Sequence, residues 1–122
     1  DAAHNPEGAG ALAAHLRAWH PERPGLLFAA MQDKDIAGML APLLPVVGPV
    51  VLAPMDTARA ARPETIAALI EALDPARAVT LATDVPSAVA SLLASHTTAV
   101  ASGSIVLLGA VRSCPDVRAI LR

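Results

Sequence analysis

The sequence predicts an α/β domain in which a mostly parallel sheet carries helices on both faces, in three layers. Short, continuously apolar runs alternate along the chain with segments whose apolar residues recur at helical spacing. An uninterrupted apolar run such as residues 26–31 is typical of a strand that is buried on both faces, which is characteristic of parallel sheets. The 122 residues suffice for one domain with a substantial core, so we expect a single domain over residues 1–122.

The first helix is predicted from about Asn5 to Trp19. Asn5 is a favoured N-cap, Pro6 a favoured first helical residue, and Glu7 lies in the first turn, where the helix dipole favours an anion. Apolar residues then follow on one predicted face: Leu12, Leu16 and Trp19.

A strand, a helix and a second strand are predicted next. Residues 26–31 form the first apolar run, and residues 36–44 carry apolar residues at helical spacing until Pro45 closes the helix. Residues 50–53 are a second buried run, followed by a loop over residues 54–62. This order already predicts one strand–helix–strand crossover.

The second half of the chain repeats the alternation. Pro63 and Glu64 open a helix that should end at Asp74-Pro75, and residues 78–82 predict a third strand. The following helix is predicted to be capped by Asp84 or Val85, with Pro86 at its first position. The remaining predicted elements are a strand over residues 98–101, a helix over residues 105–111 and a short helix over residues 116–122.

Composition excludes several classes of function. The net charge of −2 provides no basic surface for nucleic acid or an anionic membrane. The single cysteine, Cys114, allows no internal disulfide and fits a reducing, cytoplasmic setting, and the polar start lacks the basic region of a signal peptide. Residues 36–55 and 85–111 are long and apolar, but prolines interrupt the first and serines at helical spacing make the second amphipathic. We therefore expect both to be buried soluble structure rather than membrane spans.

Polar segments follow the predicted strands, where ligands bind in parallel sheets. These segments are 32–35, 56–62, 83–84 and 102–104. Asp1 and His4 precede the first helix, whose free N–H groups attract phosphate. Asp1 would suit a ribose hydroxyl or a metal-bound phosphate, and His4 a phosphate oxygen. A helix-capping segment with a solvated histidine is the alternative.

Three further residues are candidates for binding an anionic substrate. Lys34, the single lysine, lies between Asp33 and Asp35 and could grip a carboxylate or phosphate, although an acidic capping pair beside a surface lysine gives the same pattern. Arg59 could bind an anionic substrate such as a glutamate tail. Ser104 lies at a helix start and could bind an anion, although a capping turn explains it equally well. The histidines show no zinc-binding spacing with Cys114, and we assign no metal ligand and no catalytic residue.

Four segments in order resemble the C-terminal domain of folylpolyglutamate synthetase and dihydrofolate synthase, enzymes of the Mur ligase superfamily. They are Asp1-Ala2-Ala3-His4-Asn5-Pro6, Met31-Gln32-Asp33-Lys34-Asp35-Ile36, Ala58-Arg59-Ala60-Ala61 and Ser102-Gly103-Ser104-Ile105-Val106-Leu107-Leu108-Gly109. The resemblance covers essentially the whole chain and implies a Rossmann-like domain.

The resemblance also implies a function. In this family an ATP-dependent ligase activates a carboxylate as an acyl phosphate, which the amine of L-glutamate attacks; the carboxylate belongs to dihydropteroate or a folate. The aspartate and histidine that match Asp1 and His4 lie at the ATP nucleotide and its phosphates. The phosphate loop and the Mg²⁺ ligands lie in a larger N-terminal domain, and a strand precedes the aspartate. No G-x-x-x-x-G-K-[ST] motif occurs here, so we expect the chain to lack that strand and that domain and to be inactive alone.

Three other interpretations remain open. The chain could be the equivalent domain of a Mur cell-wall ligase, although the Asp-Lys-Asp segment and the Ser102-Gly103-Ser104 ending look more like the folate branch. It could be a flavodoxin-like phosphoacceptor domain with Asp56 as acceptor, although Lys34 comes too early in the chain for that site. It could also be a non-catalytic docking module.

Overall fold

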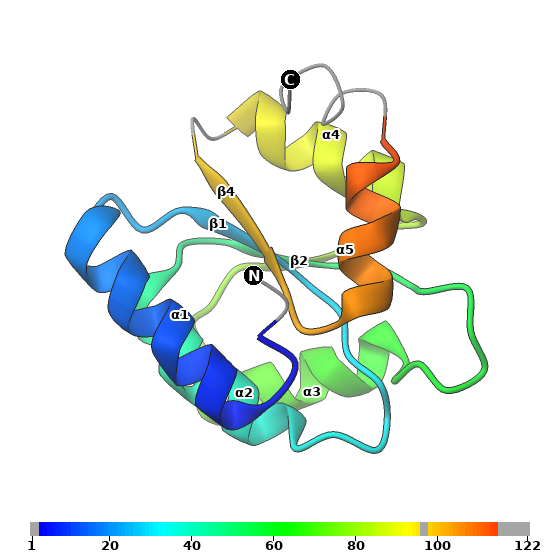
Figure 1. The fold of residues 1–122 in the computed structure, drawn as a ribbon, viewed down its shortest axis with the longest axis horizontal. Helices are drawn as coiled ribbons and strands as arrows, with labels where there is room; N and C mark the ends of the chain where they lie inside the picture. Colours follow the sequence, from blue (N-terminus) through cyan, green and yellow to red (C-terminus); the bar gives the residue numbers. More distant parts are fainter. Residues whose placement is uncertain (1–2, 96–97, 115–122) are drawn as a thin grey trace.

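The computed structural model describes residues 3–95 and 98–114, which form four parallel strands and five α-helices in alternation (Figure 1). The strands are β1 (Gly25–Phe28), β2 (Val50–Leu52), β3 (Val79–Leu81) and β4 (Ala99–Ser102), and their order in the sheet is β3-β2-β1-β4. The helices are α1 (Pro6–Trp19), α2 (Ile36–Leu43), α3 (Pro63–Leu73), α4 (Val85–Ser95) and α5 (Ile105–Arg112), and a 3₁₀ turn, η1 (Leu44–Val46), follows α2. The predicted fold class is confirmed.

Strand β1 is central and buried at every residue. Leu26 stands opposite Val50 of β2 and Val100 of β4. Alternate residues of β1 enter different cores, because successive side chains of a strand point to opposite faces. Leu26 and Phe28 belong to the core under α1, α2 and α3, whereas Leu27 belongs to the core under α4 and α5. The continuous apolar run in the sequence is thus the signature of a strand covered on both sides, and Figure 1 shows the two helical layers.

The predicted starts of the helices agree with the structure to within one residue; Pro86, predicted at the first position of its helix, is the second residue of α4. Asn5 caps α1, where its side chain accepts a hydrogen bond from the Gly8 N–H at 2.7 Å, and Pro6 is the first helical residue. Leu12 and Leu16 are buried as expected. The expectation for Trp19 is wrong, because its side chain is 72% exposed. It is the last residue of α1, at the margin of the molecule, where no further layer covers the helix (Figure 1).

Strand β1 ends earlier than its apolar run predicts. Ala29 and Ala30 stay buried but leave the strand, and Met31 forms an isolated antiparallel bridge with Ala60. Among the described residues no helix has the length and apolarity needed to cross a lipid bilayer. The short helix predicted over residues 116–122 lies outside the described residues.

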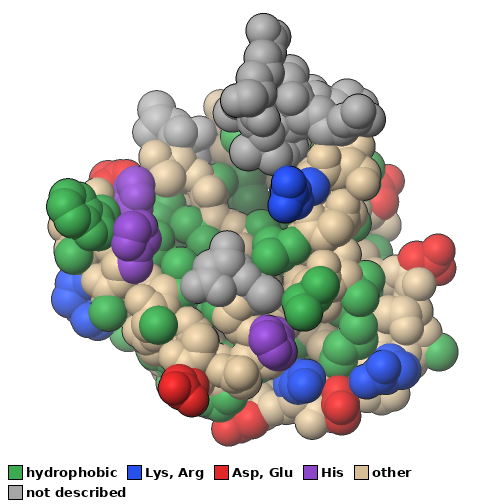
Figure 2. Space-filling model, in the orientation of Figure 1, with side chains coloured by type: hydrophobic (Ala, Val, Ile, Leu, Met, Phe, Trp, Pro, Cys, Tyr) green, Lys and Arg blue, Asp and Glu red, His purple; other side chains and the backbone are tan. Residues whose placement is uncertain are grey.

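The outer side of β4 is an edge of the described sheet. β4 pairs with β1 on its inner side. A groove of about 570 Å³ runs between α1 and β4, lined by Ala11, Leu12, His15, Leu16, His20 and residues 98–101. Figure 2 shows hydrophobic side chains beside histidines in this region.

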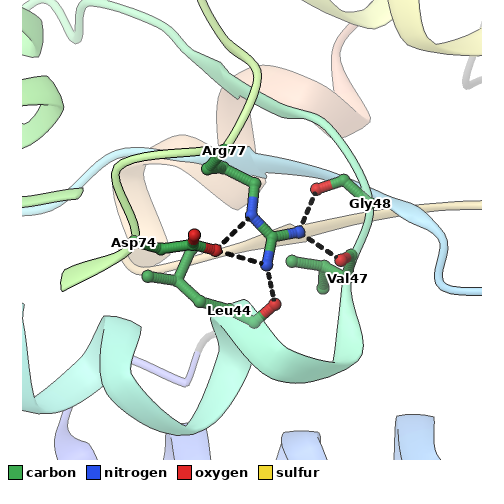
Figure 3. Close-up of polar contacts among 5 residues, drawn as sticks. All are labelled: Leu44, Val47, Gly48, Asp74 and Arg77. Atoms are coloured by element: carbon green, nitrogen blue, oxygen red, sulfur yellow. Dashed lines mark hydrogen bonds and ion pairs between the residues drawn. The ribbon is translucent and has the colours of Figure 1, made fainter. Parts of the chain in front are cut away.

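At the amino ends of the strands, Arg77 joins two segments of the chain, residues 44–48 and 74–77 (Figure 3). Its guanidinium donates to the carbonyl oxygens of Leu44, Val47 and Gly48, the last at 2.9 Å. It also pairs with Asp74, with Nη2 and Oδ2 2.9 Å apart. The side chain of Arg77 is 9% exposed, so this network ties the η1–β2 connection to the α3–β3 turn in a largely dry setting.

We predict that Arg77→Leu lowers the free energy of unfolding by about 2–4 kcal/mol, because three carbonyls and a carboxylate lose a buried charged donor. Urea unfolding followed by circular dichroism measures the change. Arg62→Leu is the matched control, since the Arg62 side chain is 83% exposed and its contact with Glu64 is 3.8 Å long. A loss at Arg77 no larger than at Arg62 would contradict the assigned role.

Candidate functional site

The carboxyl ends of the parallel strands lead into loops that carry the predicted binding residues. His4 directly precedes the Asn5 cap of α1 and is half-buried, and Ala3 is 3% exposed with a φ of 43°. The left-handed backbone at Ala3, unusual for a residue with a Cβ, turns the chain from the core toward His4. His4 therefore stands at the start of α1 as predicted, whereas Asp1 lies outside the described residues.

Lys34 lies in the loop between β1 and α2, and its two acidic neighbours are engaged elsewhere. Asp35 caps α2 by accepting from the Gly38 N–H at 3.0 Å. An oxygen of Asp33 lies 3.8 Å from a guanidinium nitrogen of Arg59. Within the described part of the chain, no carboxylate lies within ion-pair distance of the Lys34 ammonium group, which is exposed. Lys34 is thus available to an anionic ligand.

Main-chain hydrogen bonds hold the Lys34 loop against the Arg59 loop. The Gln32 N–H donates to the Arg59 carbonyl at 2.8 Å, and the Ala61 N–H donates to the Ala30 carbonyl at 2.9 Å. These two bonds flank the Met31–Ala60 bridge. Sequence reasoning did not find this junction, because pairing between two loop backbones leaves no pattern of side chains. Lys34 and Arg59 are thereby carried by one connected structure.

Arg59 is less available than the sequence suggested. Its side chain is 71% exposed but shares the contact with Asp33. An ion pair of 3.8 Å at this exposure contributes little to stability, so a stronger anionic ligand could displace Asp33. The role of Arg59 in substrate binding remains a prediction.

Ser104 is 3% exposed and caps α5, accepting from the Val106 N–H at 3.1 Å. This geometry fits the capping interpretation, and substrate binding by Ser104 remains a prediction. Before it, Gly103 has a φ of 115°, and a Cβ at this residue would lie 2.2 Å from the carbonyl oxygen of Ala29. The hydroxyl of Ser102 is buried and has no hydrogen-bond partner among the described residues. The turn is therefore close against the end of β1.

Asp84 provides the cap of α4 at the end of β3. Its carboxylate accepts from the Ser87 N–H at 2.7 Å. This backbone hydrogen bond, followed by one from the Ser87 side chain, holds the pKa of the Asp84 carboxyl below its ordinary value. Capping thus accounts for Asp84 in the polar segment at residues 83–84.

The predicted binding residues that the structure describes, His4, Lys34, Arg59 and Ser104, all lie in the loops at this edge. Histidine, basic and acidic side chains gather over the loop between β1 and α2 in Figure 2. Among residues 3–95 and 98–114 no cluster of histidine, cysteine or acidic side chains could hold a metal ion. The described edge offers helix N–H groups, an imidazole and cations, which suit the recognition of phosphate and carboxylate groups.

Comparison with known proteins assigns the chain to a family. Residues 1–111 match the family described as "Mur ligase, glutamate ligase domain". The fold is similar to Mycobacterium tuberculosis folylpolyglutamate synthase complexed with ADP and AMPPCP (31% identity, TM-score 0.84), covering 93% of this chain and 28% of that chain. It is also similar to Escherichia coli FolC in complex with DHPP and ADP (30% identity, TM-score 0.81); this match covers 98% of this chain and 28% of that chain. A third similar structure is the bifunctional folylpolyglutamate synthase/dihydrofolate synthase of Yersinia pestis (27% identity, TM-score 0.77), where the match covers 93% of this chain and 27% of that chain. No curated protein sequence gives a significant match.

We predict that Ser104→Ala lowers the free energy of unfolding by about 1 kcal/mol, because α5 loses its cap. Chemical denaturation measures this loss. Ser91→Ala is the control, since Ser91 is exposed inside α4 and alanine favours a helix there. Equal stability of the Ser104 and Ser91 variants would show that the cap contributes nothing.

The stabilising effect of Asp84 should depend on pH. A lowered pKa means that the folded state favours the carboxylate, so the effect is complete above the ordinary pKa of 3.8 and is lost as pH falls through the lower folded pKa. The stability difference between wild type and Asp84→Ala should therefore be constant down to about pH 5 and shrink below pH 3.8. Thermal unfolding across this range tests it, with Asp84→Asn as a non-titrating cap. A difference that grows in acid would contradict this assignment.

Proposed function

The chain belongs to the Mur ligase glutamate ligase domain family, and we propose that it is the C-terminal domain of an ATP-dependent ligase that adds L-glutamate to dihydropteroate or folate. The chain spans about 28% of the length of the folylpolyglutamate synthases to which it is similar. The whole enzyme's reaction is therefore inferred from this domain and its relatives. The similarity to three folylpolyglutamate synthases at 27–31% identity supports the folate branch.

The observation that carries the proposal is that His4, at the start of α1, and the exposed Lys34, before α2, lie at the same edge of the sheet. ATP supplies the phosphoryl group that turns the substrate carboxylate into an acyl phosphate, and the glutamate amine then displaces phosphate to form an amide. ATP, the substrate carboxylate and glutamate are all anionic, so the enzyme must present hydrogen-bond donors and cations to them. The edge described above carries such groups, which supports the proposal.

We assign the binding roles as follows. His4 contacts the phosphates of ATP, and Asp1 binds its nucleotide. Lys34 binds a carboxylate of glutamate as a point charge. Arg59 exchanges Asp33 for a substrate carboxylate, and Ser104 adds its hydroxyl to the glutamate site while it caps α5.

The remaining parts of the reaction require residues outside this chain. The 122 residues contain no G-x-x-x-x-G-K-[ST] phosphate loop, and the described residues include no metal cluster. We propose that a larger N-terminal domain supplies both the phosphate loop and the Mg²⁺ ligands and closes on this edge. We also propose that a strand before Asp1 pairs with the outer side of β4, beside the groove along α1. A cytoplasmic location would suit this chemistry, and neither nucleic acid nor a membrane is a proposed partner.

The other interpretations receive no support of their own. The solved structures that this chain resembles are folylpolyglutamate synthases, and no observation favours a Mur cell-wall ligase or a docking module. Asp56 belongs to an exposed loop after β2, and the neighbouring structures give a phosphoacceptor role no basis.

We predict that the parent enzyme releases ADP only when L-glutamate and dihydropteroate or a folate are both present, and that residues 1–122 alone release none. A coupled ADP assay on both proteins measures this. Activity with muramoyl substrates instead of folates would reassign the enzyme to the cell-wall branch. Glutamate-dependent ADP release by residues 1–122 would show that this chain is not half of a two-domain site.

A further inference from the structure

Two helices that start at the binding edge share an arrangement that the other helices lack. In α1 and α2 the predicted ligand residue, the capping residue and a glycine occupy corresponding positions: His4, Asn5 and Gly8, and Lys34, Asp35 and Gly38. Each glycine is the third residue of its helix and donates its N–H to the cap side chain, at 2.7 Å in α1 and 3.0 Å in α2.

Glycine is not needed for capping itself. Asp84 caps α4 by the same bond, at 2.7 Å, although the third residue of that helix is Ser87, which has a Cβ. Glycine at the third position of an exposed helix start also costs helix stability relative to alanine. The presence of glycine in both helices that follow a predicted binding residue therefore calls for a reason other than the cap bond.

The space around the two glycines gives that reason. A Cβ on Gly38 would lie 2.4 Å from an oxygen of Asp35, and the whole carboxylate would be within 3.1 Å. A Cβ on Gly8 would lie 3.2 Å from the Cα of Ala3 and 3.3 Å from Oδ1 of Asn5. In α2 the cap side chain occupies the place where a Cβ would stand, whereas in α1 the cap oxygen and the left-handed turn at Ala3 lie close beside that place.

We propose that Gly8 and Gly38 are positioning residues for His4 and Lys34. By admitting the cap side chain and the preceding backbone against the helix, each glycine fixes the residue immediately before the cap. An alanine at Gly38 would require the Asp35 carboxylate to leave its present position, and an alanine at Gly8 would require the Ala3 backbone and the Asn5 side chain to shift by a few tenths of an ångström. Either shift would displace the residue before the cap while leaving the rest of the helix intact. This inference rests on the proposed function for the identity of the two ligands, a nucleotide at His4 and glutamate at Lys34.

The test uses the full-length parent ligase and four alanine variants. Gly8→Ala and Gly38→Ala probe the proposal. Gly10→Ala in α1 and Gly109→Ala in α5 are matched controls, because a Cβ at either residue meets nothing within 4 Å. KM for ATP, KM for glutamate, kcat and the melting temperature are measured for each variant.

We expect Gly8→Ala to raise KM for ATP by about three- to tenfold with little change for glutamate, and Gly38→Ala to do the reverse. The controls should keep both constants. This crossed pattern separates positioning from loss of stability, which would move both constants and the melting temperature together. Probe variants that behave like the controls, or that raise both constants equally, would overturn the proposal.

Binding of ADP measured by calorimetry on the same proteins needs no turnover. Weaker binding in Gly8→Ala but not in Gly38→Ala supports the proposal, and equal binding in both overturns it for His4. An inactive wild-type parent that still shows this difference in ADP affinity would refute the glutamate ligase function while leaving the positioning role of Gly8 in place.

Discussion

Strand β1 exposes none of its four residues to solvent, and this burial on both faces constrains everything around it. Helices must cover each side, and crossovers that return to parallel strands bring every strand–helix loop to the same edge. Leu26 and Phe28 anchor one layer, and Leu27 anchors the other. The carboxyl edge of the sheet, which carries the candidate site, is therefore a consequence of how the central strand is buried.

The two ends of the sheet differ in how their polar groups are satisfied. At the amino ends of the strands, Arg77 occupies carbonyls of the η1–β2 connection and the carboxylate of Asp74, so this network is internally satisfied. At the carboxyl ends, carboxylates and amides are used for caps, and the half-buried His4 and exposed Lys34 remain for other contacts. The polar groups at one end are used within the fold, and the other end carries the proposed binding residues.

The sequence predicted the order and type of every described strand and α-helix, because continuous apolar runs and capping residues are local signals, but it did not predict the 3₁₀ turn η1. It predicted Asn5 as a cap and Pro6 as a helix start for the same reason. It failed at Trp19, since periodicity indicates a face of a helix but not how far the neighbouring layer extends. It also extended β1 too far, because buried loop residues such as Ala29 and Ala30 are as apolar as a strand.

For the candidate site, the sequence predicted where the described residues lie in the fold, but not the contacts among them. The positions of His4 and Lys34 after strands or before helices follow from the chain order, but the contact of Asp33 with Arg59 and the Met31–Ala60 bridge join segments far apart in sequence. The proposed positioning role of Gly8 and Gly38 likewise rests on the space around them, because a glycine in the sequence of a helix by itself indicates only a weaker helix.

The central claim is that the carboxyl edge of the sheet, and not the Arg77 end, receives the nucleotide. Hydrogen–deuterium exchange of the parent ligase with and without ADP and Mg²⁺ tests it most directly. Slower exchange in residues 3–9 with unchanged exchange in residues 44–49 and 74–78 is the predicted result. Protection confined to the Arg77 end, or absent from the whole domain, would contradict the account.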